Sequence, residues 1–391
     1  MTDGFSFLII GMLAMHLAAA ILLGGFWLRN QSTVGLSAIT LSPIASFVGL
    51  VLAFGFGEAT SFLQVLGIYV FLVLGHAAAW VGLADFWHQK TKRQMLLVVV
   101  LGIATVFAIL FYQAGGGVPV GRTALVSIFF AISSFSVVLV IFRAKGFRID
   151  IYESAIRESR LGSYFVMGLF ILHGLANLYR IFSWPELGLD TLFSGDEVTW
   201  FTPLTVLEAL MFTPLYVTGV IMMVAERLQT ELRVEQMLEP VTRSLNRRAF
   251  LTVAKVVLAR ARRNADAVSI LLIEVANIKD IRDAVGRTGC DKVLKQLSTA
   301  VVAGRREQDI FSRFSNDEFL LILPGTPEEG ATLLEDRVKG EILGRSYHQK
   351  GKDVTVRVKL ASYTARGDDL EAEGMIDAVA KTLAQNSQQT A

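Results

Sequence analysis

A short polar turn, residues 313–319 with the sequence RFSNDEF, separates two apolar runs late in the chain. It carries two adjacent acids, Asp317 and Glu318, whose oxygens are of the kind that bind hard cations such as Mg²⁺. An Arg-Xaa-Xaa-Asp pattern, formed by Arg306 and Asp309, stands shortly before the turn. A guanidinium group can hold a phosphate or a base edge through two parallel hydrogen bonds. These residue types suit a phosphorylated ligand.

Three blocks of this region resemble the signature segments of the GGDEF family of bacterial diguanylate cyclases. They are residues 239–250 (EPVTRSLNRRAF), residues 274–283 (EVANIKDIRD) and the turn at 313–319. Gly286 and Asp291 follow the second block at the family's spacing. The resemblance implies an α+β domain that handles guanine nucleotides, and it says nothing about the first half of the chain.

The resemblance also implies roles for individual residues. Glu274 and Asp317 stand at the family's magnesium positions, with Glu318 beside Asp317, and Asp291 stands at a position that reads guanine. In the family, magnesium neutralises phosphate charge while a ribose hydroxyl attacks GTP, and such catalysis is largely positioning and electrostatics. Arg306 and Asp309 have the spacing of the family's inhibitory site, which binds the product, cyclic di-GMP.

The sequence departs from the family where this chemistry would occur. Ser315 and Asn316 replace the two glycines of the turn, and each adds a Cβ where the family's backbone lies against the phosphates of GTP. A tight hairpin is also expected to demand positive φ, at a cost of about 1 kcal/mol per residue. Glu274 replaces an aspartate and Arg282 an asparagine, and the family's phosphate-holding Lys and Arg have no counterpart at their positions in 378–388. These changes predict a degenerate domain that acts as a cyclic di-GMP receptor or regulator.

Two other functions remain open at this stage. A diguanylate cyclase of low or conditional activity would use Glu274, Asp317 and Glu318 to bind magnesium together with GTP. A recruitment scaffold would bind protein partners and no nucleotide.

The composition predicts a membrane protein. Of the 391 residues 53% are hydrophobic and 18% charged, and the mean hydropathy is +0.50, which is more apolar than soluble proteins of this length. The net charge of +2 gives no reason to expect nucleic acid as a partner. Seven apolar segments are long enough to cross a hydrocarbon layer of about 30 Å. They are Phe5–Trp27, Leu36–Phe54, Phe62–Phe86, Met95–Tyr112, Ala124–Phe142, Leu161–Ile181 and Phe201–Val224.

The basic residues predict the orientation of these spans, because Lys and Arg near span ends stay on the cytoplasmic side. Alternate loops on one side carry Arg29, Lys90, Lys92, Arg93, Arg143, Lys145, Arg148, Arg157 and Arg160, whereas the other side has only Arg122 and, at a span end, Arg180. The asymmetry predicts a bacterial inner-membrane protein with its N-terminus outside and its C-terminal domain in the cytoplasm.

The chain therefore divides into a seven-span sensor or anchor over residues 1–224, a connecting helix over 225–237 and a GGDEF-type domain over 238–391. The connecting helix has a thin apolar stripe, so it is either a short coiled coil in a homodimer or a solvated connector. The pattern of the domain predicts strands at Val268–Val275, Ile310–Phe314, Phe319–Leu323 and Val354–Ala361, and helices at Val285–Val302, Glu328–Ile342 and Met375–Leu383.

Ionisable residues inside the predicted spans are costly, and this makes them functional candidates. His16, His76, His173 and Glu208 lie there, and counting from the span ends places His173 and Glu208 in the outer half as a plausible buried pair. Three interpretations stay open for the histidines: haem or metal ligation by two of them, hydrogen bonds to neighbouring helices, or the sensing of a small ligand. The single cysteine, Cys290, excludes an intramolecular disulfide.

Overall fold

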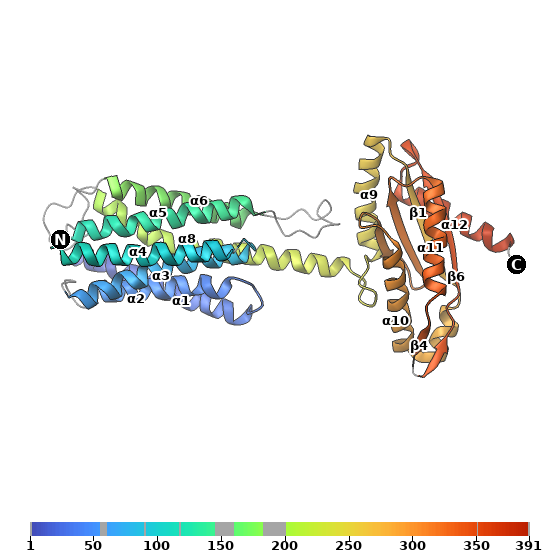
Figure 1. Ribbon diagram of the computed structural model, residues 1–391, viewed down its shortest axis with the longest axis horizontal. Coiled ribbons are helices and arrows are strands. Elements are labelled where there is room, and N and C mark those ends of the chain that lie inside the picture. The colour runs from blue at the N-terminus through green and yellow to red at the C-terminus, as the bar shows by residue number, and fades with distance from the viewer. Residues whose placement is uncertain are drawn as a thin grey trace. The chain divides into compact units, whose positions relative to one another are not determined.

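A computed structural model describes residues 2–54, 61–89, 91–116, 119–144, 160–182, 201–349 and 351–389. The chain forms two compact units, one that ends at Leu228 and one that begins at Gln229 (Figure 1). Four basic residues used to predict the orientation, Lys90, Lys145, Arg148 and Arg157, lie outside the described residues.

The first unit consists of long apolar helices. Seven of the described helices are long and apolar enough to cross a membrane, and each contains one predicted span. Large apolar side chains such as Phe107, Phe111 and Phe142 remain exposed on them, as expected of surfaces that face lipid. The helices are α1 (Thr2–Arg29), α2 (Leu36–Phe54), α3 (Phe62–Phe86), α4 (Lys92–Ala114), α5 (Pro119–Arg143), α6 (Leu161–Phe182) and α8 (Phe201–Met237).

Close packing of α6 against α8 depends on two glycines. A Cβ at Gly162 would lie 2.7 Å from the backbone nitrogen of Met223, and one at Gly219 would lie 2.5 Å from the side chain of Val166. α8 runs without a break through both the last predicted span and the predicted connecting helix. One helix therefore leads from the apolar bundle to the second unit.

The second unit is an α+β domain built on a four-stranded antiparallel sheet with the order β2-β3-β1-β6. Strand β1, which lies between β3 and β6, is buried almost throughout, which explains why six of its eight residues are apolar. The strands are β1 (Val268–Val275), β2 (Ile310–Arg313), β3 (Glu318–Pro324) and β6 (Val358–Ala365), with β4 (Tyr347–Gln349) and β5 (Lys352–Val354) as a separate hairpin.

Helices pack against the sheet and form two apolar cores. One core joins the sheet to α10 (Ile278–Gly304) and α11 (Glu328–Leu343), and the other joins it to α9 (Arg247–Asn264) and α12 (Ala372–Gln389). A single 3-10 turn, Gly367–Asp369, precedes α12. α10 changes direction at Gly286, whose φ of 74° suits glycine.

The predicted strand Val354–Ala361 is wrong at its start. β5 ends at Val354, and β6 begins only at Val358. The side chain of Asn277 donates to the carbonyl of Thr355 and accepts from the N–H of Arg357, both at 2.8 Å. These bonds occupy the backbone groups that a strand would use, so the chain bends there. The sequence pattern also missed the β4–β5 hairpin and α9.

Candidate functional site

The acids singled out in the sequence gather at one end of the sheet. Glu274 pairs with Glu318 across the β1–β3 ladder, and the N–H of Val275 donates to the carbonyl of Asp317 at 2.8 Å. The three carboxylate residues thus come from the end of β1 and from the β2–β3 turn. The sheet brings together residues separated by more than forty positions.

The turn is closed by the side chain of Ser315. Its hydroxyl donates to Oδ1 of Asp317 at 2.9 Å and accepts from the N–H of Glu318 at 3.2 Å. Neither Ser315 nor Asn316 has positive φ, so the prediction of backbone strain at these positions is wrong. The serine hydroxyl supports the turn in the way that serine side chains commonly do, and glycine is not required.

Glu274 has a basic neighbour. Nζ of Lys359, on the adjacent strand β6, lies 3.7 Å from Oε1 of Glu274. Asp317 is engaged by Ser315, and the described residues contain no group of three or more His, Cys, Asp or Glu placed to hold a metal ion. Mg²⁺ demands near-ideal octahedral oxygen geometry, and this arrangement does not fit it.

A second set of contacts connects the first motif, residues 239–250, to the β2–β3 turn. The carboxylate of Glu239 accepts from Arg313 and from the N–H groups of Val241 and Thr242. Burial by itself raises the pKa of Glu239, but the hydrogen bonds from Thr242 and the charge of Arg313 outweigh it and lower the pKa. The folded structure therefore stabilises the ionised form of the Glu239 carboxylate.

Arg306 and Asp309 lie in one tight turn. The N–H of Arg306 donates to Oδ2 of Asp309 at 2.6 Å, and the N–H of Asp309 donates back to the carbonyl of Arg306 at 3.1 Å. The Arg306 residue is exposed, whereas Asp309 is only 1% exposed. Burial raises the pKa of Asp309 despite the Arg306 N–H and the neighbouring arginine charges. The guanidinium is accessible, and the carboxylate must rotate outward to meet a ligand.

The residues at the family's guanine-reading positions lie on both sides of the Gly286 bend. The charge of Arg282 acts on the thiol of Cys290, the neighbour of Asp291 in sequence. Burial raises the pKa of Cys290, opposed by the Arg282 charge. Arg282 thus brings a positive charge close to the thiol beside Asp291, at a position where the family places an asparagine.

In the helical bundle, His76 of α3 and His173 of α6 are neighbours. Their Nε2 atoms lie 3.0 Å apart, and Nδ1 of His173 lies 2.6 Å from Oε1 of Glu208 on α8, which confirms the predicted pair. His16 does not join this contact, because its Nε2 lies 2.9 Å from the hydroxyl of Thr213. Phe130 stacks on His76 with a centroid distance of 3.7 Å.

The predicted haem or metal site does not fit this geometry. The two Nε2 atoms lie at hydrogen-bond distance, and Glu208 holds the opposite nitrogen of His173. No third histidine, cysteine or acid completes a metal-binding group in the part of the chain that the structure describes. Hydrogen bonding between helices, one of the three interpretations left open, is observed for each of the three histidines.

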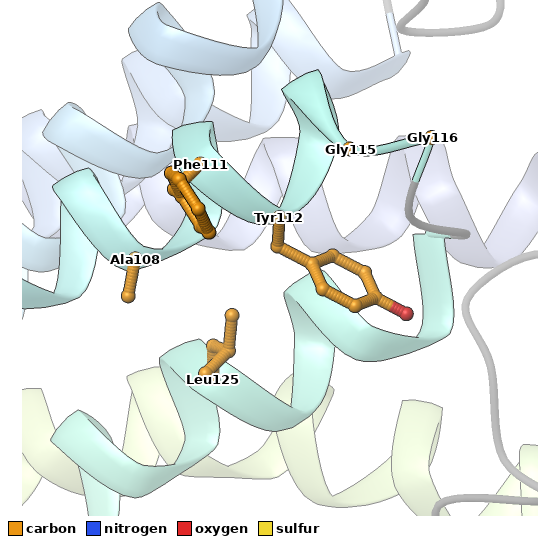
Figure 2. Close-up of a pocket in the computed structure, with 6 residues that line it drawn as sticks. All are labelled: Ala108, Phe111, Tyr112, Gly115, Gly116 and Leu125. Carbon is orange, nitrogen blue, oxygen red and sulfur yellow. The ribbon is translucent and has the colours of Figure 1, made fainter.

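The bundle also has an apolar pocket between α4 and α5 (Figure 2). Tyr112 is the one lining residue with a polar side chain. The lining residues are Ala108, Phe111, Tyr112, Gly115, Gly116 and Leu125. None of the residues predicted to act in the protein lies there.

Comparison with known proteins identifies the second unit. Residues 236–391 match the family described as "Diguanylate cyclase, GGDEF domain". This part of the chain is a GGDEF domain, and it follows seven candidate membrane helices.

The similar proteins are matched over part of the chain. Diguanylate cyclase DosC of Escherichia coli K12 is 29% identical over 126 residues, which are 32% of this chain and 27% of DosC. Diguanylate cyclase DgcS of Shewanella oneidensis is 28% identical over 155 residues, 40% of this chain and 51% of DgcS. The chain thus spans about a quarter of DosC and about half of DgcS. The FimX GGDEF domain of Pseudomonas aeruginosa, at 16% identity, aligns over 39% of this chain and 94% of its own with a TM-score of 0.37.

Sequence reasoning missed several residues of these sites. Neither the contact of Lys359 with Glu274 nor that of Arg180 with Glu208 was predicted. Arg180 was visible at a span end, but only as an orientation signal. The alternation of β6 carries the signal for Lys359, provided that the start of that strand is placed at Val358.

Proposed function

We propose that this protein is a membrane signalling protein whose GGDEF domain does not make cyclic di-GMP and instead binds it at Arg306 and Asp309. The proposal is carried by the closure of the turn by Ser315. In a phosphate-binding turn the backbone N–H groups face the ligand. Here the serine hydroxyl accepts from the N–H of Glu318, so a phosphate would have to displace it.

The electrostatics of the old catalytic face support the same conclusion. Lys359 lies beside Glu274, and the Ser315 hydroxyl is bonded to Asp317. A magnesium ion would have to compete with both contacts. Arg282, at the guanine-reading position, brings a positive charge close to Cys290. Three separate elements, β6, the turn and α10, thus depart from the requirements of GTP binding.

The Arg306–Asp309 turn presents a guanidinium and a carboxylate that can bind a ligand made of phosphates and guanine. The exposed guanidinium can pair with phosphate or a guanine edge. Oδ1 of Asp309 makes no hydrogen bond in the described structure and can accept from guanine once the side chain turns outward. We place the N-terminus outside and the GGDEF domain in the cytoplasm of a bacterium, where guanine nucleotides are available.

Parallel titrations of the full-length protein in nanodiscs test the proposal. We expect cyclic di-GMP to bind in the micromolar range, worth about 8 kcal/mol, and GTP to bind far more weakly. No cyclic di-GMP should form from GTP and Mg²⁺. Turnover would overturn the proposal in favour of a conditional cyclase that uses Glu274, Asp317 and Glu318. If neither cyclic di-GMP nor GTP binds, the proposal is overturned in favour of a recruitment scaffold.

A further inference from the structure

The helical bundle contains a polar cluster around His76 and His173. The contacts of this cluster define which ring nitrogens carry a hydrogen. Nδ1 of His173 lies 2.6 Å from a carboxylate oxygen of Glu208, so this nitrogen carries a hydrogen and donates it. The contact of 3.0 Å between the Nε2 atoms of His173 and His76 is a hydrogen bond only when one of the two nitrogens, and not both, carries a hydrogen. With both rings neutral, His76 donates and His173 accepts.

The charges around the pair cancel in this state. Nη2 of Arg180 lies 2.7 Å from Oε2 of Glu208, so the carboxylate holds a guanidinium on one oxygen and the His173 ring on the other. Nη1 of Arg180 also bonds Oδ1 of Asn177 at 3.2 Å, and Asn177 is completely buried. The cluster has a net charge of zero when both histidines are neutral.

Few other ionisable groups face the pair from the described helices. Within electrostatic range of His76 are His173 and Arg180 from α6 and His16 from α1, and α8 contributes Glu208. α5 contributes Phe130, and α2 contains no titratable residue. The titratable residues of α4 and α5 lie toward the helix ends: Lys92, Arg93, Tyr112, Arg122 and Arg143.

An added proton changes the charges and the hydrogen arrangement of the pair. A proton on Nε2 of His173 would turn its contact with Glu208 into a charge-assisted hydrogen bond, and His76 would have to change to its Nδ1–H form to accept at Nε2. A proton on Nδ1 of His76 would leave a net positive charge on a ring stacked against Phe130, in apolar surroundings where an unpaired charge is costly. Histidine is the side chain whose charge ordinarily changes near neutral pH.

We propose that the His76–His173 pair is a proton-binding site, and that its occupation changes the hold of Glu208 on α8. The proton comes from water, and it enters through the less buried end of the cluster. There the side chains of Arg180 and Glu208 are 14% and 22% exposed, against 7% for His173. The proposal names a membrane stimulus and does not depend on what the GGDEF domain binds.

α8 is the element that can carry the change. Glu208 lies near its beginning, and its last residue, Met237, accepts from the N–H of Asn246, the N-cap of α9. The side chain of Asn246 also donates to the carbonyl of Gln236 at 2.7 Å. A shift of α8 is thus transmitted through two hydrogen bonds to the first motif of the GGDEF domain.

The test uses the full-length protein labelled with ¹⁵N-histidine in nanodiscs, with solid-state NMR spectra recorded between about pH 4.5 and 8.5. At high pH we expect His76 and His173 each to show one protonated and one bare ring nitrogen, with the two rings coupled. Both signals should change together as one proton binds. His173→Gln should move the transition of His76 by about one pH unit or more. His16→Gln, a matched change in the same bundle, should leave it in place.

A second measurement follows α8 directly. Hydrogen exchange of residues 229–246 in the unsubstituted protein should change over the pH range in which the pair titrates, and Glu208→Gln should abolish that change. Both rings remaining neutral throughout would overturn the proposal without any variant. Stoichiometric metal in elemental analysis of the purified protein, or an exchange change that survives Glu208→Gln, would also overturn it.

Discussion

Arg313 joins the first motif of the GGDEF domain to the β2–β3 turn. Its Nη1 lies 3.0 Å from Oε1 of Glu239, and its Nη2 lies 2.9 Å from the carbonyl oxygen of Asn316. The Arg313 and Glu239 side chains are 10% and 18% exposed, so this contact is shielded from water to a degree that most surface ion pairs are not. The segment that follows α8 and the altered turn are therefore mechanically coupled.

Arg313→Ala should loosen both segments. We expect the free energy of local opening at the Val241, Thr242 and Glu318 amides to fall by about 1.5–3 kcal/mol, the usual value of a hydrogen bond to a charged group. Hydrogen exchange on the full-length protein measures it. Arg243→Ala is the matched control, because Arg243 pairs with Glu235 in an exposed contact and should change the same amides by less than about 1 kcal/mol. Equal effects would contradict the coupling.

Acid should release the same contact. Because the pKa of Glu239 is lower in the folded protein, its stabilising contribution is complete above the unfolded pKa of this group and is lost as the pH falls through the folded value. Exchange of the Val241 and Thr242 amides, corrected for the intrinsic rate, should therefore accelerate in the acid range. Glu239→Gln should remove this pH dependence. A dependence that persists in Glu239→Gln would assign it to another group.

Restoring the two glycines should not restore catalysis. The double substitution Ser315→Gly with Asn316→Gly removes the hydroxyl that occupies the Glu318 N–H, but it leaves Lys359 beside Glu274. We expect no cyclic di-GMP from GTP and Mg²⁺ in a coupled or chromatographic assay of the full-length variant. The family's phosphate-holding basic pair would also still be absent. Turnover by the double variant would show that the turn alone prevents catalysis.

Substitutions at Arg306 and Asp317 should have different effects on the affinity for cyclic di-GMP. Arg306→Ala should weaken binding roughly 10- to 100-fold, as expected for the loss of charge-assisted hydrogen bonds, whereas Asp317→Ala should change little. Arg260→Ala, which removes an exposed arginine from α9, controls for the change in net charge. Equal losses from Arg306→Ala and Asp317→Ala would place the ligand on the face formed by Glu274, Asp317 and Glu318.

The sequence by itself determined the elements. Hydropathy over about 20 residues reports burial in lipid or protein directly, so α2 and α3 have the bounds predicted for them, and the buried strand β1 does too. Motif spacing located the GGDEF domain, because its three blocks lie within one continuous segment. The boundary of β6 could not be predicted, since it depends on the side chain of Asn277, far away in the chain.

Only the tertiary structure decided which side chains meet. Hydropathy shows that His76 and His173 lie in spans, but their contact requires α3 and α6 to pack with the right rotation and depth, over a separation of 97 residues. The pairing of Lys359 with Glu274 likewise depends on the register of β6 beside β1. At the turn the sequence showed that Ser315 replaces a glycine and predicted strain. The structure shows a hydroxyl that closes the turn, because side-chain direction depends on neighbours that no local pattern contains.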